Sequence, residues 1–367
     1  MENTVKKAFL VGIRDEKMSA AQADSLTNEL SSLVDTLGLE IAGREIVRIR
    51  EKHAKYGIGT GKAEELAQKA ASLEVNCIIF DREISPSQQR NWENLSGISA
   101  IDREELIIQI FSGRARTREA ELQISLAEHI HALPRLQHKY IDLSRQRGGR
   151  YGTRGSGETF YETDRRQVQR KIHRLKEELE VVKRQRQVQR SQRERQGIPV
   201  AALVGYTNSG KSTIMNALTG AGVLAENKLF ATLDSTTRRL RLPVGTQILL
   251  VDTVGFIRRL PHSLIDAFRS TLEEASRANL LLNVLDASDI DAPQHYETTL
   301  SVLRELGASD IPMITVLNKI DKLESPDSVK DIIRLYPNSI SLSAAKGEGI
   351  DMLYKKIEQA LNKKVLL

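Results

Sequence analysis

The chain has 367 residues, of which 40% are hydrophobic and 28% charged, with 54 Lys and Arg against 48 Asp and Glu. This length predicts two or three domains with packed cores, and the hydrophobic content argues against a chain that is disordered throughout. The single cysteine, Cys77, excludes an internal disulfide and a cysteine-rich metal site, and we interpret it as a buried apolar residue. No apolar run reaches the ~20 residues of a membrane span and no signal-peptide pattern is present, so we expect a cytoplasmic protein.

The first part of the chain, residues 1–112, has the pattern of a small α/β domain. Strand patterns at 5–13, 46–49, 77–80 and 98–101 alternate with helical patterns at 19–37 and 63–73. Ser19 is the expected N-cap of the first helix and Gly38 its stop. The segment 57–62, GIGTGK, lacks the spacing of a phosphate-binding loop, so we expect a turn that opens the helix from Ala63. The histidines show no metal-ligand spacing.

Residues 113–196 predict a long antiparallel helical hairpin. A helical pattern covers 113–143, with Pro134 inside it, and a second covers 158–196. The second carries an apolar seam with alternating steps of four and three, typical of coiled coils: Val168, Ile172, Leu175, Leu179 and Val182. Between them, residues 145–157 contain five glycines and four arginines, which predicts a loop.

From residue 197 to 362 the sequence predicts a doubly wound, mostly parallel sheet. Strand patterns lie at 199–204, 239–243, 247–251, 280–286, 313–318 and 339–341. The second and third of these are joined by a short turn at 244–246, so we expect one antiparallel strand pair. We expect residues 363–367 to form a short tail after this domain.

A phosphate-binding loop follows the first of these strands. Residues 205–212, GYTNSGKS, match the pattern G-x-x-x-x-G-K-S/T, with an apolar strand before it and a helical run after it. Its glycines let backbone N–H groups close around a phosphate at a helix N-terminus. Lys211 is expected to reach the β- and γ-phosphates, and the Ser212 hydroxyl to bind Mg²⁺.

Three more motifs follow strands in the order typical of a GTPase domain. Residues 252–255, DTVG, place the Asp252 carboxylate to reach Mg²⁺ through water and the Gly255 amide to contact a γ-phosphate. Residues 318–321, NKID, supply Asp321, whose carboxylate accepts from two donors that guanine has and adenine lacks. Residues 343–346, SAAK, can offer a backbone N–H to guanine O6. The set predicts a domain that binds GTP and GDP.

The motifs leave two parts of the chemistry open. A threonine must complete the Mg²⁺ shell, and Thr232, Thr236 and Thr237 all fit by spacing. Many GTPases place a glutamine directly after D-x-x-G to orient the attacking water, whereas this chain has Phe256 and then Ile257. We therefore name no catalytic residue, assign supporting roles to the lysine of the loop, the threonine and Gly255, and expect slow hydrolysis that an outside surface stimulates.

The strings GYTNSGKS, LFATLD, DTVGFIRRLP, NKID and SAA resemble the HflX family of ribosome-associated GTPases, as does GGRYGTRGSGETFYETDRR. The resemblance covers about residues 5–360. It implies that FATLD supplies the switch threonine, Thr232, and that the protein faces the ribosome and splits stalled or stressed ribosomes. Ser156 stands where the family usually has proline, and many members continue into a further C-terminal domain beyond the position of Leu367.

The expected metal ligands are Ser212 and Thr232, with Asp252 acting through water. The expected GTP-binding residues are Gly205, Tyr206, Thr207, Asn208, Ser209, Gly210, Lys211, Ser212, Thr213, Phe230, Ala231, Thr232, Leu233, Asp234, Asp252, Thr253, Val254, Gly255, Asn318, Lys319, Asp321, Ser343, Ala344 and Ala345. Related GTPases with an apolar residue at the glutamine position use an asparagine like Asn208 to bind K⁺, and a loop-capping role for Asn208 is the alternative.

The positive charge is concentrated in the hairpin. Residues 145–196 hold 16 Lys and Arg and seven Asp and Glu, a net charge of +9, so the remainder carries −3. Arginine pairs with phosphates or stacks on bases, and tyrosine stacks on unpaired bases. We therefore predict RNA contact at the loop through Arg145, Arg147, Arg150, Tyr151 and Arg154, against the alternative of a solvated charged helix. The family resemblance directs this loop at the catalytic centre of the large subunit.

These observations predict a monomeric, Mg²⁺-dependent GTPase that binds the large ribosomal subunit and its RNA and couples GTP binding and hydrolysis to ribosome splitting or rescue. A location in the cytoplasm, with association to ribosomes or peripherally to the membrane, follows from this prediction. Two alternatives stay open: a GTPase of ribosome assembly, and a nucleotide-gated ribosome-binding module with incidental hydrolysis.

Overall fold

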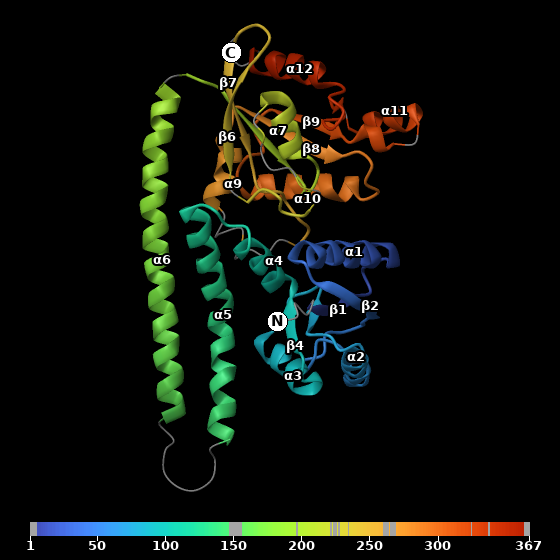
Figure 1. The fold of residues 1–367 in the computed structure, drawn as a ribbon, viewed down its shortest axis with the longest axis vertical. Coiled ribbons are helices and arrows are strands. Elements are labelled where there is room, and N and C mark those ends of the chain that lie inside the picture. The colour runs from blue at the N-terminus through green and yellow to red at the C-terminus, as the bar shows by residue number, and fades with distance from the viewer. Residues whose placement is uncertain are drawn as a thin grey trace, which may run out of the picture. The chain divides into compact units, whose positions relative to one another are not determined.

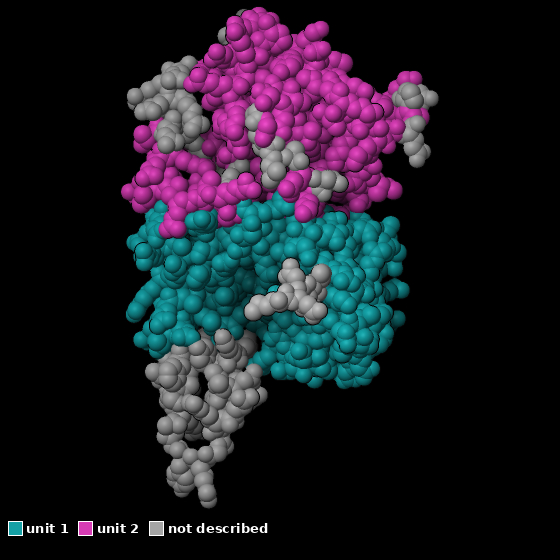
Figure 2. All heavy atoms as spheres, viewed as in Figure 1, with its two compact units in different colours: residues 1–114, 121–179 teal, residues 115–120, 180–367 magenta. Residues whose placement is uncertain are grey.

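The computed structural model contains two compact units, residues 1–114 with 121–179 and residues 115–120 with 180–367 (Figure 2). It describes residues 6–146, 156–195, 197–220, 222, 226, 228–233, 235–259, 264, 269–323, 325–336 and 338–362, without the side chains of 137–146, 156–161, 189–195, 269–271 and 326–328. Within these residues, none of the helices has the length and apolar character needed to cross a membrane.

The elements of the first unit alternate between strand and helix and then end in long helices (Figure 1). In chain order they are β1 (Lys7–Arg14), α1 (Ala20–Leu37), β2 (Glu40–Arg48), α2 (Thr60–Ser72), β3 (Cys77–Phe80), α3 (Pro86–Ser96), β4 (Ser99–Asp102) and α4 (Arg103–Ser112), followed by α5 (Arg118–Gln146) and α6 (Ser156–Arg195). The first residues of α5, 118–120, and the last part of α6, 180–195, belong to the second unit.

The strands of the first unit form a parallel sheet in the order β2-β1-β3-β4, which confirms the predicted α/β class. Ser19 caps α1 through a reciprocal capping box with Gln22, and Gly38 ends that helix in the left-handed conformation. Strand β2 begins at Glu40, six residues before the strand that the sequence predicts at 46–49. Helices α3 and α4 were not predicted, although side chains cap both of them, Ser85 at α3 and Asp102 at α4.

The turn before α2 is part of the core of this unit. Trp92 is fully buried, and its indole Nε1 donates to the Tyr56 carbonyl at 3.0 Å. Its ring also lies against the rings of Tyr56 and Phe80. The helix that follows begins at Thr60 with Gly59 as its N-cap, three residues earlier than expected. The segment 57–62 therefore opens a helix, as predicted, and Tyr56 anchors it.

Helices α5 and α6 run alongside each other as the predicted hairpin (Figure 1). On α6, Leu175 and Leu179 are buried, and the other three seam residues are half-buried. Two boundaries of the predicted loop were wrong, because α5 continues to Gln146 and α6 begins at Ser156, so both ends of the segment 145–157 are helical. Adding a residue to an existing helix is far easier than nucleating one, which lets long helices extend into such segments.

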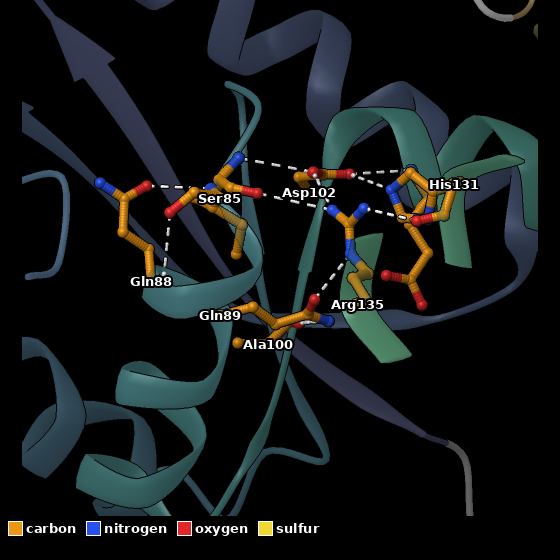
Figure 3. Close-up of polar contacts among 9 residues, drawn as sticks. Ser85, Gln88, Gln89, Ala100, Asp102, His131 and Arg135 are labelled. Carbon is orange, nitrogen blue, oxygen red and sulfur yellow. Dashed lines mark hydrogen bonds and ion pairs between the residues drawn. The ribbon is translucent and has the colours of Figure 1, made fainter. Parts of the chain in front are cut away.

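A buried polar cluster joins α5 to the α/β part of the first unit (Figure 3). Its centre is Asp102, the last residue of β4, which accepts from the backbone N–H of Glu105 at 2.9 Å. Arg135 of α5 donates to the same carboxylate at 3.0 Å and to Gln89 at 2.8 Å. His131, one turn earlier on α5, places its Nε2 3.6 Å from Asp102. The cluster sets the position of α5 on the sheet.

The second unit holds the larger sheet. Its elements are β5 (Val200–Gly205), α7 (Lys211–Thr219), β6 (Thr236–Arg241), β7 (Gln247–Asp252), α9 (Arg269–Ser276), β8 (Leu280–Asp286), α10 (Ala292–Glu305), β9 (Met313–Asn318), a 3₁₀ turn (Ile320–Lys322), α11 (Pro326–Leu335), β10 (Ile340–Ser341) and α12 (Ile350–Asn362).

The strand order of this sheet is β10-β9-β8-β5-β7-β6. All neighbours are parallel except β6, which pairs antiparallel with β7. The predicted doubly wound sheet with one antiparallel pair is therefore confirmed. Apolar side chains from β5, β7, β8 and β9 fill the core, and the loops after β5, β7 and β9 emerge at the same edge of the sheet. This edge is where ligands bind in open parallel sheets.

Candidate nucleotide-binding site

The loop between β5 and α7 is shaped by its glycines. Gly210 directly precedes α7 and has a φ of +97°, and a Cβ there would collide with the side-chain amide of Asn318. No other residue type fits this position, because it combines left-handed backbone with a close neighbour. The loop thereby delivers the N-terminus of α7 to one edge of the sheet, a geometry that favours phosphate.

Lys211 is buried beneath this loop. Its Nζ donates to the carbonyl oxygens of Gly205 at 3.1 Å and Tyr206 at 2.7 Å. Burial lowers the pKa of Lys211 to about 8, although the neighbouring charge of Asp252 opposes the shift. A buried ammonium whose hydrogen bonds go to carbonyl oxygens is poorly compensated, so an anionic phosphate at the loop would stabilise its charged form.

Three oxygen-bearing side chains converge beside the loop. Ser212 donates to Asp252 at 2.7 Å and shares a 2.6 Å hydrogen bond with Thr232, which itself lies 3.3 Å from the same carboxylate oxygen. Asp252 is fully buried, and its other oxygen, Oδ1, has no hydrogen-bond partner within the part of the chain that the structure describes. Burial raises the pKa of Asp252, and the contacts with Lys211, Ser212 and Thr232 offset this only in part.

This cluster fits a magnesium ion. Mg²⁺ binds hydroxyl, carboxylate and water oxygens, and it commonly uses few protein ligands together with phosphate. A buried carboxylate with a raised pKa is incompletely compensated by Lys211 and the two hydroxyl groups, and Mg²⁺ would supply further positive charge. Of the three threonines left open by spacing, Thr232 contacts this cluster, whereas Thr236 and Thr237 begin β6.

The opposite end of the cavity is organised by Asn318. Its amide nitrogen donates to the Ser209 carbonyl at 2.9 Å, and its oxygen accepts from the Ala344 backbone N–H at 3.1 Å. The segment after β10 is thereby tied to the phosphate loop. Ser343 donates to Asp321 at 2.6 Å, and this hydrogen bond lowers the pKa of the Asp321 carboxyl. The carboxylate is therefore ionised and held in place, as recognition of two guanine N–H groups requires.

The segment after β7 lies directly on the phosphate loop. A Cβ on Gly255 would come within 2.6 Å of the Thr207 backbone, so only glycine permits this approach. The next residue, Phe256, is 1% exposed, and its backbone exchanges hydrogen bonds with Gly205 and Thr207. Phe256 is thus a packing residue whose ring points away from solvent, which agrees with the absence of a water-orienting side chain at this position.

The structure brings most of the predicted residues to one cavity. The predicted residues that line it are Thr207, Asn208, Gly210, Lys211, Ser212, Thr213, Phe230, Ala231, Thr232, Gly255, Asn318, Lys319, Asp321 and Ala345. Two lining residues were missed, Glu226 and Lys322, for which no motif gave a signal.

The remaining predicted residues support the cavity without lining it. Tyr206, Ser209, Leu233, Thr253 and Val254 are buried. Gly205, Asp252, Ser343 and Ala344 act through the contacts described above. Asp234 lies outside the described residues, and so do Arg147, Arg150, Tyr151 and Arg154 of the predicted RNA-binding loop and the side chain of Arg145.

Family models match three consecutive parts of the chain. They are described as the N-terminal part of a GTP-binding GTPase at residues 13–112, the middle region of a GTP-binding GTPase at 114–193, and a 50S ribosome-binding GTPase at 200–319.

Individual relatives match almost the whole length. A protein named GTPase HflX from Akkermansia muciniphila is 45% identical over 97% of this chain and 86% of its own length. One of the same name from Escherichia coli is 42% identical over 92% of this chain and 79% of its own. A crystal structure of a GDP complex of a protein named SsGBP is 25% identical, with a TM-score of 0.51 over 98% of this chain and 99% of that one.

Proposed function

The chain belongs to the HflX family of GTPases, and from that premise we propose that it is a Mg²⁺-dependent GTPase that binds the large ribosomal subunit and couples its nucleotide state to ribosome splitting or rescue. The family is ribosome-associated, and its members bind and hydrolyse GTP. The proposal adds Mg²⁺ dependence, the ribosomal target and the roles of individual residues.

The observation that carries the proposed chemistry is the convergence of Ser212, Thr232 and Asp252. Ser212 and Thr232 would bind Mg²⁺ directly and Asp252 through water, and the ion would neutralise charge on the phosphates. Lys211 would exchange its loop carbonyls for phosphate oxygens, and the Gly255 N–H would contact the γ-phosphate. Asp321 would select guanine. The test is nucleotide binding with and without Mg²⁺, in which only GTP and GDP bind tightly and EDTA weakens GTP binding.

No side chain at the position after Gly255 can orient the attacking water, because Phe256 is buried. We therefore propose that hydrolysis is slow in the free protein and is raised when the large subunit orders the segments around Thr232 and Gly255. Single-turnover hydrolysis with and without purified large subunits tests this, and equal rates contradict it.

A potassium ion is a further proposed component. The backbone of Asn208 has a positive φ of 60°, and its carbonyl accepts from Lys319 at 2.7 Å, so the residue is held at the mouth of the cavity. If Asn208 binds K⁺ across the phosphates, hydrolysis is faster in KCl than in NaCl. Equal rates favour the loop-capping role instead.

Ribosome binding through the hairpin is supported by charge. The net charge of +9 within residues 145–196 lies on the tip and on α6, where Arg165, Arg170 and Lys171 are exposed. Binding to RNA through such groups releases counterions, so salt should weaken ribosome binding far more than GTP binding. The family models support a separate hairpin, since the middle region matches 114–193, and we keep 1–112, 113–196 and 197–362 as the proposed domains.

Sedimentation of intact ribosomes with the protein and GTP separates the proposed outcomes. Splitting predicts loss of the 70S peak, whereas a role in assembly leaves intact ribosomes unchanged. The effect should persist with a non-hydrolysable GTP analogue if binding drives separation and hydrolysis drives release. A nucleotide-gated binding module with incidental hydrolysis would likewise keep its effect on ribosomes with the analogue.

A further inference from the structure

Tyr206 belongs to the phosphate loop by sequence, but its side chain leaves the nucleotide cavity. It is 4% exposed, and its ring stacks on His295 of α10 with ring centroids 3.7 Å apart and planes 15° apart. Its hydroxyl oxygen accepts from the backbone N–H of Arg258 at 2.8 Å. Its carbonyl accepts from Lys211. One residue thus connects the phosphate-binding lysine, the segment after β7 and α10.

The Arg258 hydrogen bond extends a short ladder between two functional segments. Phe256 donates its N–H to Gly205 at 3.1 Å, and Thr207 donates to Phe256 at 2.7 Å. These two bonds hold the segment 255–258 at its beginning, and the Tyr206 hydroxyl holds it two residues later. The position of the Gly255 amide relative to the phosphate loop therefore depends on both attachments.

The start of α10 supports this arrangement from the other side. His295 is 7% exposed, and its Nδ1 lies 3.6 Å from the Asp289 carboxylate. The Arg258 side chain reaches Asp291, directly before α10, at 3.7 Å. Two residues of the short segment 289–291 thus contact the two partners of Tyr206, so the ring stack and the hydroxyl bond are parts of one packed unit.

We propose that Tyr206 is a positioning residue for GTP hydrolysis: its hydroxyl fixes the segment 255–258 against the phosphate loop, and its ring ties that segment to the start of α10. The proposal rests on the proposed role of Gly255 as the γ-phosphate contact. Because GDP has no γ-phosphate, Tyr206 affects the hydrolysis step and leaves GDP binding unaltered.

The test is the variant Tyr206→Phe, which keeps the ring stack and removes only the hydroxyl. Loss of one hydrogen bond predicts that kcat falls roughly threefold to tenfold, while KM for GTP and Kd for a fluorescent GDP stay within about twofold. In the nucleotide-free protein, amide hydrogen exchange in a peptide covering 256–259 becomes faster. The matched control is Tyr354→Phe, because Tyr354 also hydrogen-bonds a backbone group of this unit, the Leu218 carbonyl at 2.7 Å. It leaves kcat and this exchange rate unchanged.

Two results overturn the proposal. One is a Tyr206→Phe protein whose kcat and exchange both match the wild type. The other is a parallel loss of kcat and GDP affinity, which indicates a general disturbance of the loop.

The ring stack is tested by His295→Leu, which should slow hydrolysis, and by His295→Phe, which should restore it. Failure of the proposed function can be told apart from failure of this proposal. If the wild type showed no Mg²⁺-dependent hydrolysis, the difference in hydrogen exchange between the wild type and Tyr206→Phe would still be measurable.

Discussion

Two aspartates, one in each unit, end parallel strands and are fully buried, but their surroundings differ. Asp102 ends β4, and its carboxylate faces His131, Arg135 and a backbone N–H (Figure 3). Burial raises its pKa, but the interactions with His131, with the Glu105 N–H and with Arg135 outweigh burial, so the pKa is lowered. Asp252 ends β7 with hydroxyl partners and one unpartnered oxygen, and its pKa is raised.

These different surroundings are typical of a structural carboxylate at Asp102 and of a ligand-binding carboxylate at Asp252. Asp102 has a counter-cation, Arg135, within its own unit, so its charge joins α5 to the sheet. Asp252 shares the low-dielectric surroundings, but its nearest cation, Lys211, is itself turned to loop carbonyls. Burial of a charge without its partner is costly, and an external cation removes that cost. In the proposed site, stability of the free protein is thus exchanged for affinity toward Mg²⁺ and nucleotide.

The largest expected effect is on stability, from Asp102→Asn. Removing the carboxylate charge leaves Arg135 without its buried partner, and breaking such a pair costs about 3–5 kcal/mol. Urea unfolding should show this loss in the first unit, while GDP affinity stays within about twofold. Asp24→Asn, at an exposed position of the same unit, serves as the control. An Asp102→Asn protein as stable as the wild type would show that the cluster holds nothing in place.

Protonation of Asp102 at low pH should also lower the stability of the first unit. Because its pKa is lower in the folded than in the unfolded chain, the carboxylate stabilises the fold above the unfolded value of about 4. That contribution is lost as the pH falls from about 4 toward the folded pKa. Urea unfolding of the wild type and of Asp102→Asn should therefore converge in stability at the acid end of this range.

The next largest effect is on activity, from Asp252→Asn. We expect GTP hydrolysis to fall by about a hundredfold or more, because the variant loses the proposed water-mediated contact between Asp252 and Mg²⁺. The free protein should be as stable as the wild type or more so, since a buried charge is removed. Hydrolysis assays and urea unfolding measure the two parts, with the exposed Asp331→Asn as control. An Asp252→Asn protein with lower stability and normal hydrolysis would contradict the prediction, because Asp252 would then act as a structural carboxylate like Asp102.

A smaller effect, on the pH dependence of GDP binding, follows from the titration of Lys211. Its pKa of about 8 in the free protein means that above pH 8 it must take up a proton when phosphate binds. The Kd for GDP should therefore rise with pH above 8, approaching about tenfold per unit. The free protein should gain stability over the same range, because the unfolded chain then binds more protons. Titrations at pH 7, 8 and 9 measure the Kd. Lys211→Arg, which does not titrate there, should lack the dependence, and a flat wild-type profile contradicts the prediction.

The sequence alone determined the nucleotide site to a large extent. Gly205, Asp252 and Asn318 end β5, β7 and β9, and Gly210 and Asp321 follow in the adjoining loops. Parallel strands bring their carboxyl ends to one edge of the sheet. Motif order and strand pattern therefore sufficed to place them together, because each motif is local and the sheet topology is regular. The seam of α6 was predictable for a similar reason, since helical periodicity is a local property.

Only the tertiary structure decided which residues meet across long separations. Spacing left Thr232, Thr236 and Thr237 equal, and the contact of Thr232 with Ser212 and Asp252 distinguished it. The spacing of the histidines indicates no ligand pattern, yet His131 of α5 faces Asp102 at the end of β4. The stack of Tyr206 on His295 likewise joins residues of different elements. Side-chain pairs of this kind depend on how helices pack on a sheet, and packing is set by the whole core rather than by any local pattern.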